Sequence, residues 1–122
     1  MRQRKTRILL ADDNPAIRSA LALLLETRLH VHIVGEAETM QALLADVQRA
    51  KPDIVILDWE LPGVPIQARA AALRAVHAPL KLVVTSSRPE VAEQFQAAHV
   101  DAYVCTCEQP ELVVQAIQAM IS

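Results

Sequence analysis

Ile54–Gly63 read IVILDWELPG, and this stretch decides how the rest of the chain is interpreted. Its first four residues are apolar and rich in β-branched side chains, which is typical of a strand buried on both faces. The run ends in a carboxylate, Asp58, and Pro62 and Gly63 then predict a loop. In an open parallel sheet, ligands bind beyond the carboxyl ends of the strands. We therefore expect Asp58 to lie at a functional site.

Composition is that of a globular protein. The 122 residues are 52% hydrophobic and 21% charged, and the net charge is −2. We interpret the basic run Arg2–Arg7 as a solvated lead-in and not as a nucleic-acid-binding arm. No apolar stretch of the sequence approaches the roughly 20 residues that cross a bilayer, and no signal-peptide pattern opens it. We expect one cytoplasmic domain over residues 1–122, without membrane contact.

Apolar runs alternate with segments of helical periodicity along the chain. Five strands and five helices joined by short loops predict a parallel sheet covered by helices on both faces. The expected strands are Ile8–Ala11, Val31–Ala37, Ile54–Leu57, Leu82–Thr85 and Ala102–Cys105. The expected helices run from Pro15 to about Arg28, from Glu38 or Thr39 to the turn at Lys51, from Pro65 to about Val76, from Pro89 through Ala98, and from Pro110 through Met120. Asn14 or Asp13 is the expected N-cap of the first helix.

Polar side chains follow three of the expected strands. The first strand ends in Asp12 and Asp13, the third in Asp58, and the fourth in Thr85. These ends share one edge of a parallel sheet, so the side chains converge in space. Clustered carboxylates repel one another unless a cation lies among them, and hard oxygen ligands suit Mg²⁺. With a hydroxyl donor beside them, they indicate phosphoryl transfer onto a carboxylate.

The sequence resembles the receiver domain of two-component response regulators from Arg7 to Met120. The motifs that carry the resemblance are ILLADDNPAIR, DIVILDWELPG, VVTSSR and DAYV. The DWELPG form and the EQPELVVQAI ending are most similar to receivers of regulators with a helix-turn-helix output domain. The resemblance implies an α/β, flavodoxin-like, doubly wound five-stranded parallel sheet with strand order 2-1-3-4-5.

The resemblance also implies roles for individual residues, matched motif by motif. Asp58 is the expected phosphoacceptor. Asp13 is expected to bind Mg²⁺ directly with the help of Asp12, and Asp58 and the backbone carbonyl of Glu60 complete the protein ligands.

Two further residues match the switch of the family. Thr85 is the expected switch hydroxyl, which donates a hydrogen bond to the phosphoryl group, and Ser86 is the alternative if the register slips by one. Tyr103 is the expected switch aromatic, which swings inward when the hydroxyl moves toward the phosphate.

The chain departs from the family pattern near the fifth strand. The family has a lysine where this sequence has Thr106, and glycine-alanine where it has His99-Val100. Without the lysine, more of the screening of the carboxylates falls to the metal. Arg88 is a candidate substitute cation, although a loop arginine is more often simply solvated.

The resemblance implies a signalling domain and not an enzyme, apart from help with its own phosphotransfer and dephosphorylation. The expected partner is a sensor histidine kinase, and phosphorylation is expected to switch the surface of the fourth helix, fifth strand and fifth helix. Homodimerisation through that surface is compatible with the sequence, as is a monomer, and no direct nucleic-acid binding by this chain is expected.

The alternative function is that of a degenerate pseudo-receiver, which binds proteins independently of phosphate. Thr106 and His99 favour this alternative. A small-molecule-binding domain is a third reading, but no glycine-rich phosphate loop follows the first strand.

Overall fold

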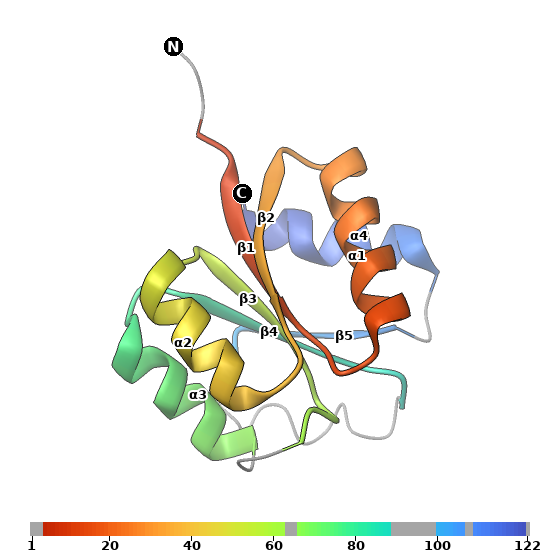
Figure 1. Ribbon diagram of the computed structural model, residues 1–122. Coiled ribbons are helices and arrows are strands. Elements are labelled where there is room, and N and C mark those ends of the chain that lie inside the picture. The colour runs from red at the N-terminus through yellow and green to blue at the C-terminus, as the bar shows by residue number, and fades with distance from the viewer. Residues whose placement is uncertain (1–3, 63–65, 89–99, 107–108, 122) are drawn as a thin grey trace.

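The protein, described here from a computed structural model, has a five-stranded parallel sheet at its centre (Figure 1). The structure describes residues 4–62, 66–88, 100–106 and 109–121. The strands are β1 (Thr6–Ala11), β2 (Val31–Ala37), β3 (Ile54–Asp58), β4 (Lys81–Ser86) and β5 (Ala102–Cys105). Their order is β2-β1-β3-β4-β5, and every pair is parallel. The predicted fold class and strand order are confirmed.

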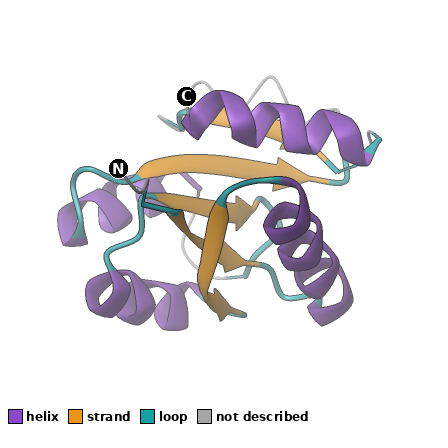
Figure 2. Cartoon of the chain, turned by 90° about the horizontal axis from the view of Figure 1, so that it is seen from above, coloured by secondary structure: helices purple, strands orange, loops and turns teal. Residues whose placement is uncertain are grey.

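Helices cover both faces of the sheet (Figure 2). The described helices are α1 (Pro15–Arg28), α2 (Met40–Ala50), α3 (Ile66–Val76) and α4 (Pro110–Ile121). The helix expected from Pro89 through Ala98 lies outside the described residues, so the label α4 belongs to the helix expected fifth. Of the described helices, none is long and apolar enough to cross a membrane.

The alternation of side chains along the central strands builds two separate cores. Leu9 and Leu57 point to one face of the sheet, where they pack with residues of α2 and α3. Ile8 and Ile56 belong to the core on the other face, with residues of α1 and α4. Full burial of each such side chain contributes about 1.5–3 kcal/mol. The continuous apolar runs in the sequence are therefore required by a sheet covered on both sides.

The strands β1, β3 and β4 are slightly longer than the apolar pattern predicts, whereas β2 and β5 have the predicted bounds. β1 begins at Thr6, which pairs with Val31, and β4 extends from Lys81 to Ser86. The additional residues are polar or charged. Thr6 and Lys81, at the amino ends, are partly or fully exposed, whereas Ser86, at the carboxyl end of β4, is buried.

The start of α1 is fixed by a cap that also shapes the carboxyl edge of the sheet. Asn14 is the N-cap, and its side chain accepts hydrogen bonds from the backbone N–H groups of Ala16 (2.9 Å) and Ile17 (3.2 Å). Asp13 was the alternative cap. Because Asn14 satisfies these groups, the two aspartates before it are left to face the sheet edge.

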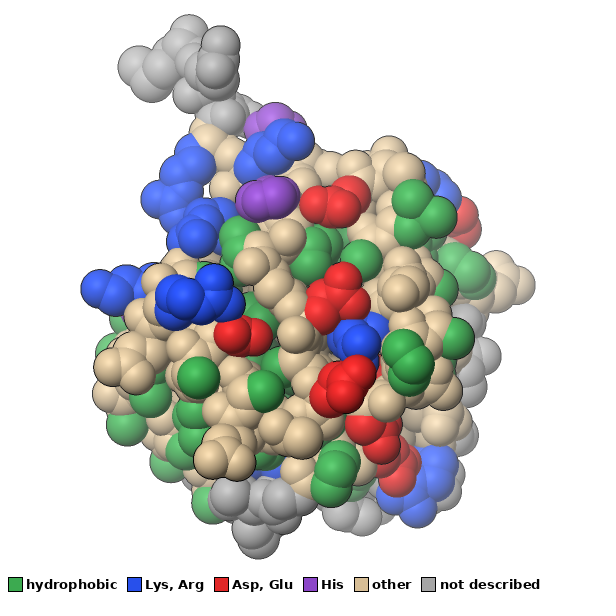
Figure 3. Space-filling model, in the orientation of Figure 1, with side chains coloured by type: hydrophobic (Ala, Val, Ile, Leu, Met, Phe, Trp, Pro, Cys, Tyr) green, Lys and Arg blue, Asp and Glu red, His purple; other side chains and the backbone are tan. Residues whose placement is uncertain are grey.

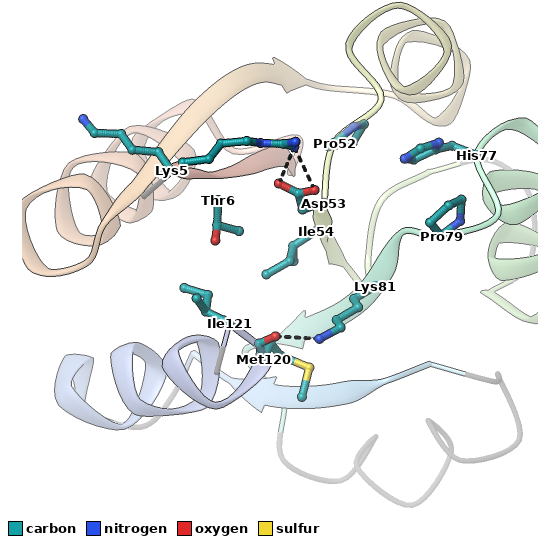
Figure 4. A pocket seen from close by; sticks show the side chains of 11 residues that line it. Lys5, Thr6, Pro52, Asp53, Ile54, His77, Pro79, Lys81, Met120 and Ile121 are labelled. Carbon is teal, nitrogen blue, oxygen red and sulfur yellow. Dashed lines mark hydrogen bonds and ion pairs between the residues drawn. The ribbon is translucent and has the colours of Figure 1, made fainter. Parts of the chain in front are cut away.

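The opposite, amino edge of the sheet holds a cavity of about 380 Å³ (Figure 4). Asp53 points into it and accepts hydrogen bonds from Arg4 at 3.2 and 3.3 Å. On the other side, Lys81 Nζ donates to the carbonyl of Met120 at 2.8 Å. Three charged groups of this cavity, those of Arg4, Asp53 and Lys81, therefore already have partners within the protein.

Candidate functional site

The third strand places Asp58 at the carboxyl edge, between the ends of β1 and β4. Ala11 is the register partner of Leu57, so Asp12 and Asp13 follow at the level of Asp58. One carboxylate oxygen from each of these three aspartates lies within 4.8 Å of the other two. The convergence predicted from the strand ends is therefore present in the structure.

The aspartates line a hollow of about 150 Å³. Its described lining residues are Asp12, Asp13, Asn14, Ile17, Asp58, Glu60, Thr85, Ser87 and Thr106. Lysine and arginine are absent from these lining residues. The hollow therefore has a strongly negative lining that no cationic side chain of the described lining neutralises.

Burial and neighbouring charge both act on Asp58. Burial is the main cause that raises the pKa of its carboxyl from 3.8 to about 6. The charges of Asp12, Asp13 and Glu60 raise this pKa further, while a hydrogen bond from the Glu60 backbone N–H (3.3 Å) lowers it. The ionised form of Asp58 is thus costly in the metal-free protein.

Asp12 is buried, whereas Asp13 is exposed. Burial raises the pKa of Asp12, and the charge of Asp13 adds to that rise. A hydrogen bond from the Asn14 backbone N–H (2.8 Å) and the charge of Arg18 act in the opposite direction. Arg18 also donates to the Asp12 carbonyl at 2.6 Å and forms ion pairs with Glu36 and Glu38. It therefore fixes the backbone of the loop that carries the two aspartates.

Thr85 lies directly beside Asp58 as its register partner on β4. Its side chain is 3% exposed and lines the acidic hollow, and its carbonyl accepts a hydrogen bond from the Trp59 N–H at 2.7 Å. Ser86, the alternative, is also buried, but its hydroxyl accepts a hydrogen bond from the Arg88 N–H at 3.0 Å. The geometry therefore favours Thr85 as the hydroxyl that faces Asp58.

Tyr103 and Arg88 lie at the rim. The Tyr103 hydroxyl donates to the Arg88 carbonyl at 3.1 Å, from β5 across the end of β4. The Arg88 guanidinium forms an ion pair with Glu60 at 2.8 Å and does not line the hollow. Arg88, the candidate substitute cation, is thus paired with the rim carboxylate of Glu60 and not with Asp58.

Two arginines beside the site were not singled out in the sequence. Arg18 holds the β1–α1 loop, as described above. Arg69 on α3 is 5% exposed, and its Nη2 donates to the carbonyl of Leu61 in the loop after Asp58. Helical periodicity places Arg69 on the buried stripe of α3, four residues before Leu73, but it does not predict which group either arginine contacts.

The donor set suits a hard divalent cation. Three carboxylates in one hollow offer oxygen ligands, the kind that Mg²⁺ prefers, and a cation would remove the repulsion that raises their pKa values. Figure 3 shows the wider charge pattern on one face: many basic side chains gather at the upper left, toward the start of the chain, while acidic ones occupy the middle and lower right with some basic ones among them.

Comparison with known proteins places this arrangement in a family. A family model described as the response regulator receiver domain matches residues 8–118. The chain belongs to this family. This confirms the resemblance expected from the four motifs, and the chain is a receiver of the two-component type.

The relatives of this receiver include regulators of transcription. The chain is 32% identical over 93 residues to the probable transcriptional regulatory protein NarL of Mycobacterium tuberculosis. This match covers 76% of the chain and 43% of that protein. The chain is 31% identical over 117 residues to the transcriptional activator protein ExaE of Pseudomonas putida, covering 94% and 55%. The chain thus spans about half the length of these relatives.

Solved structures agree with the fold. The signal receiver domain of the putative response regulator NarL from Mycobacterium tuberculosis superposes with a TM-score of 0.84 at 25% identity, with 96% of each chain covered. A two-component response regulator of the LuxR family from Aurantimonas sp. SI85-9A1 gives 0.86 at 28% identity, with 97% of this chain and 86% of that chain covered. The receiver fold therefore extends over nearly the whole chain.

Proposed function

We propose that this receiver accepts a phosphoryl group on Asp58 from a sensor histidine kinase, with Mg²⁺ bound by the acidic cluster. The observation that carries the proposal is the convergence of three carboxylates beside a buried hydroxyl at one sheet edge. Asp12, Asp13, Asp58 and the backbone carbonyl of Glu60 are the proposed protein ligands. When bound, the metal neutralises the charge that develops on the phosphoryl oxygens.

The chemistry then depends on how the chain holds Asp58. A carboxylate oxygen of Asp58 forms the new bond to phosphorus while the phosphorus–nitrogen bond of the kinase phosphohistidine breaks, and the histidine keeps the electron pair. Asp58 must be ionised to attack, so its raised pKa of about 6 favours transfer at neutral pH or above. The adjacent Thr85 hydroxyl donates a hydrogen bond to a phosphoryl oxygen.

The switch follows from this hydrogen bond. Movement of the Thr85 hydroxyl toward the phosphoryl group leaves room for the Tyr103 ring, whose hydroxyl gives up its bond to the Arg88 carbonyl and turns inward. Two discrete arrangements of this pair then change the surface around β5 and α4. The expected fourth helix, which lies outside the described residues, completes this proposed surface.

We propose that residues 1–122 act as one receiver domain and do not bind nucleic acid themselves. The similarity to transcriptional regulators supports an output on transcription through another region or partner. We also propose the cytoplasm as the location and a homodimer through the β5–α4 surface as one mode of assembly, with analytical ultracentrifugation of the phosphorylated chain as the check.

Fluorescence of Trp59 tests the main proposal, because this residue directly follows Asp58 and is the one tryptophan of the sequence. We expect a saturable response to Mg²⁺ and a second response to beryllofluoride, which mimics a phosphoryl group. Asp58→Asn should abolish the beryllofluoride response and the incorporation of phosphate from a kinase or acetyl phosphate. A wild-type protein that takes up no phosphate under these conditions would overturn the proposal.

One observation favours the second candidate, a pseudo-receiver that binds proteins independently of phosphate. Thr106 lines the hollow at the position where the family has its lysine, so no cation is provided there. In that case Mg²⁺ binding would persist without any response to beryllofluoride, and the same titration separates the two functions.

A further inference from the structure

Arg69 is a charged residue on the buried side of α3. Ala70 and Leu73 of the same helix belong to the core between the sheet and the α2–α3 layer. Arg69 precedes Leu73 by four residues and therefore shares this stripe, which ordinarily holds apolar side chains. Asp12 and Arg69 are the charged residues among the buried ones that the structure describes. A buried guanidinium is costly unless it is well partnered, so its contacts decide its role.

One contact of Arg69 is with the loop that follows the proposed phosphoacceptor. Its Nη2 donates to the carbonyl of Leu61, a residue that is itself 1% exposed. The same loop is tied on its other side to the sheet, since the Trp59 N–H donates to the Thr85 carbonyl and the Leu61 N–H donates to the Asp58 carbonyl (3.1 Å). The loop is thus held between β3–β4 and α3.

We propose that Arg69 is a positioning residue, which fixes the loop of residues 59–62 and with it the Glu60 carbonyl beside Asp58. The proposal deepens the function given above, because it rests on Glu60 as a metal ligand. The Arg69 guanidinium does not line the acidic hollow, so it acts through the loop and not by direct contact with a phosphoryl group.

The charges around the site agree with this placement. Burial lowers the pKa of Arg69, while the charge of Asp58 acts in the opposite direction, as expected for a guanidinium near that carboxylate. With threonine at position 106, the described lining of the hollow contains no cation. The positive charge of Arg69, which lies behind the loop, is therefore also electrostatically favourable beside the negatively charged edge of the sheet.

Amide hydrogen exchange of the metal-free protein tests the proposal without any phosphorylation. We expect Arg69→Met to speed exchange of the Glu60 and Leu61 amides at least tenfold, with little change at Ile117 in the core on the other face. Arg49→Met is the matched control, because Arg49 is an exposed helical arginine paired with Asp46 (2.8 Å), and it should leave the loop unchanged. Arg69→Lys, which retains a charged donor, should restore part of the protection.

Mg²⁺ titration by Trp59 fluorescence is the second readout. We expect about tenfold weaker binding in Arg69→Met and wild-type binding in Arg49→Met. Wild-type loop exchange and Mg²⁺ affinity in a folded Arg69→Met would overturn the proposal, as would faster exchange spread evenly over both cores. If Arg69→Met does not fold, Arg69→Gln takes its place with the same expectations, since its shorter side chain does not reach the Leu61 carbonyl. If the wild type binds no Mg²⁺, the proposed function fails, while the exchange experiment still decides the role of Arg69.

Discussion

Aspartates at the two edges of the sheet have opposite surroundings. At the amino edge, Asp53 accepts hydrogen bonds from the Arg7 backbone N–H (2.9 Å) and from Arg4. At the carboxyl edge, Asp58 lies beside Asp12 and Asp13 without a cationic side chain in the described lining of the hollow. The carboxylate of Asp53 thus has a cationic partner within the protein, whereas the three carboxylates at the other edge have none in the described lining. A cluster of carboxylates without a cationic partner in the described lining, and not cavity size, therefore distinguishes the candidate site from the larger cavity at the amino edge.

Removal of the charge of Asp58 should stabilise the metal-free protein. The folded pKa of about 6 lies above the ordinary value of 3.8, so the folded state holds this proton more tightly than the unfolded state. Its ionisation costs stability at pH values above 6, and the cost disappears as pH falls through 6 to below 4. We expect Asp58→Asn to gain about 1–3 kcal/mol at pH 8 and nothing near pH 4. Urea unfolding at both pH values is the measurement, and an equal effect at both would contradict this account.

Protons should compete with Mg²⁺ for the carboxyl edge. Because Asp58 must lose its proton to bind the metal, we expect about tenfold weaker binding at pH 5 than at pH 7. The raised pKa of Asp12 acts in the same direction. Isothermal titration calorimetry at the two pH values measures the change. Asp53→Ala serves as the control, since it removes an aspartate from the other edge and should leave the affinity unchanged.

Loss of the aspartate at the amino edge should lower the stability of the protein, whereas Asp58→Asn at the carboxyl edge should raise it. Asp53→Ala removes the acceptor for the Arg7 N–H and for Arg4, and we expect it to destabilise the protein by about 1 kcal/mol. Thermal unfolding beside Asp58→Asn gives the direct comparison. If both substitutions shift stability in the same direction at pH 8, the contrast between the edges is wrong.

Addition of a cation at the carboxyl edge should make its electrostatics more similar to those of the amino edge. Thr106 lines the acidic hollow, so Thr106→Lys places a positive charge near the aspartates. We expect it to stabilise the metal-free protein by about 0.5 kcal/mol and to weaken Mg²⁺ binding two- to fivefold, because both cations meet the same charges. Both effects should shrink in high salt. Unchanged Mg²⁺ affinity in low salt would show that position 106 lies too far from the bound metal to matter.

The sequence was sufficient to predict those parts of the site that depend on where strands end. Asp12, Asp58 and Thr85 each follow a buried apolar run, and the geometry of a parallel sheet then requires them to meet. The contacts of Arg18 and Arg69 could not be predicted, because they depend on where long side chains turn after the helices have packed. Arg69 even occupies a position that helical periodicity assigns to an apolar residue.

The position of β1 between β2 and β3 has a consequence for folding kinetics. The β1–α1–β2 unit forms from contacts close in sequence, and this step does not involve Asp58. The three aspartates come together only when β3 docks on β1, so their repulsion opposes this particular step. We expect metal-free refolding to slow as pH rises above 6 and Mg²⁺ to accelerate it wherever this docking is part of the transition state. The same carboxylates would then govern how quickly the chain becomes a receiver.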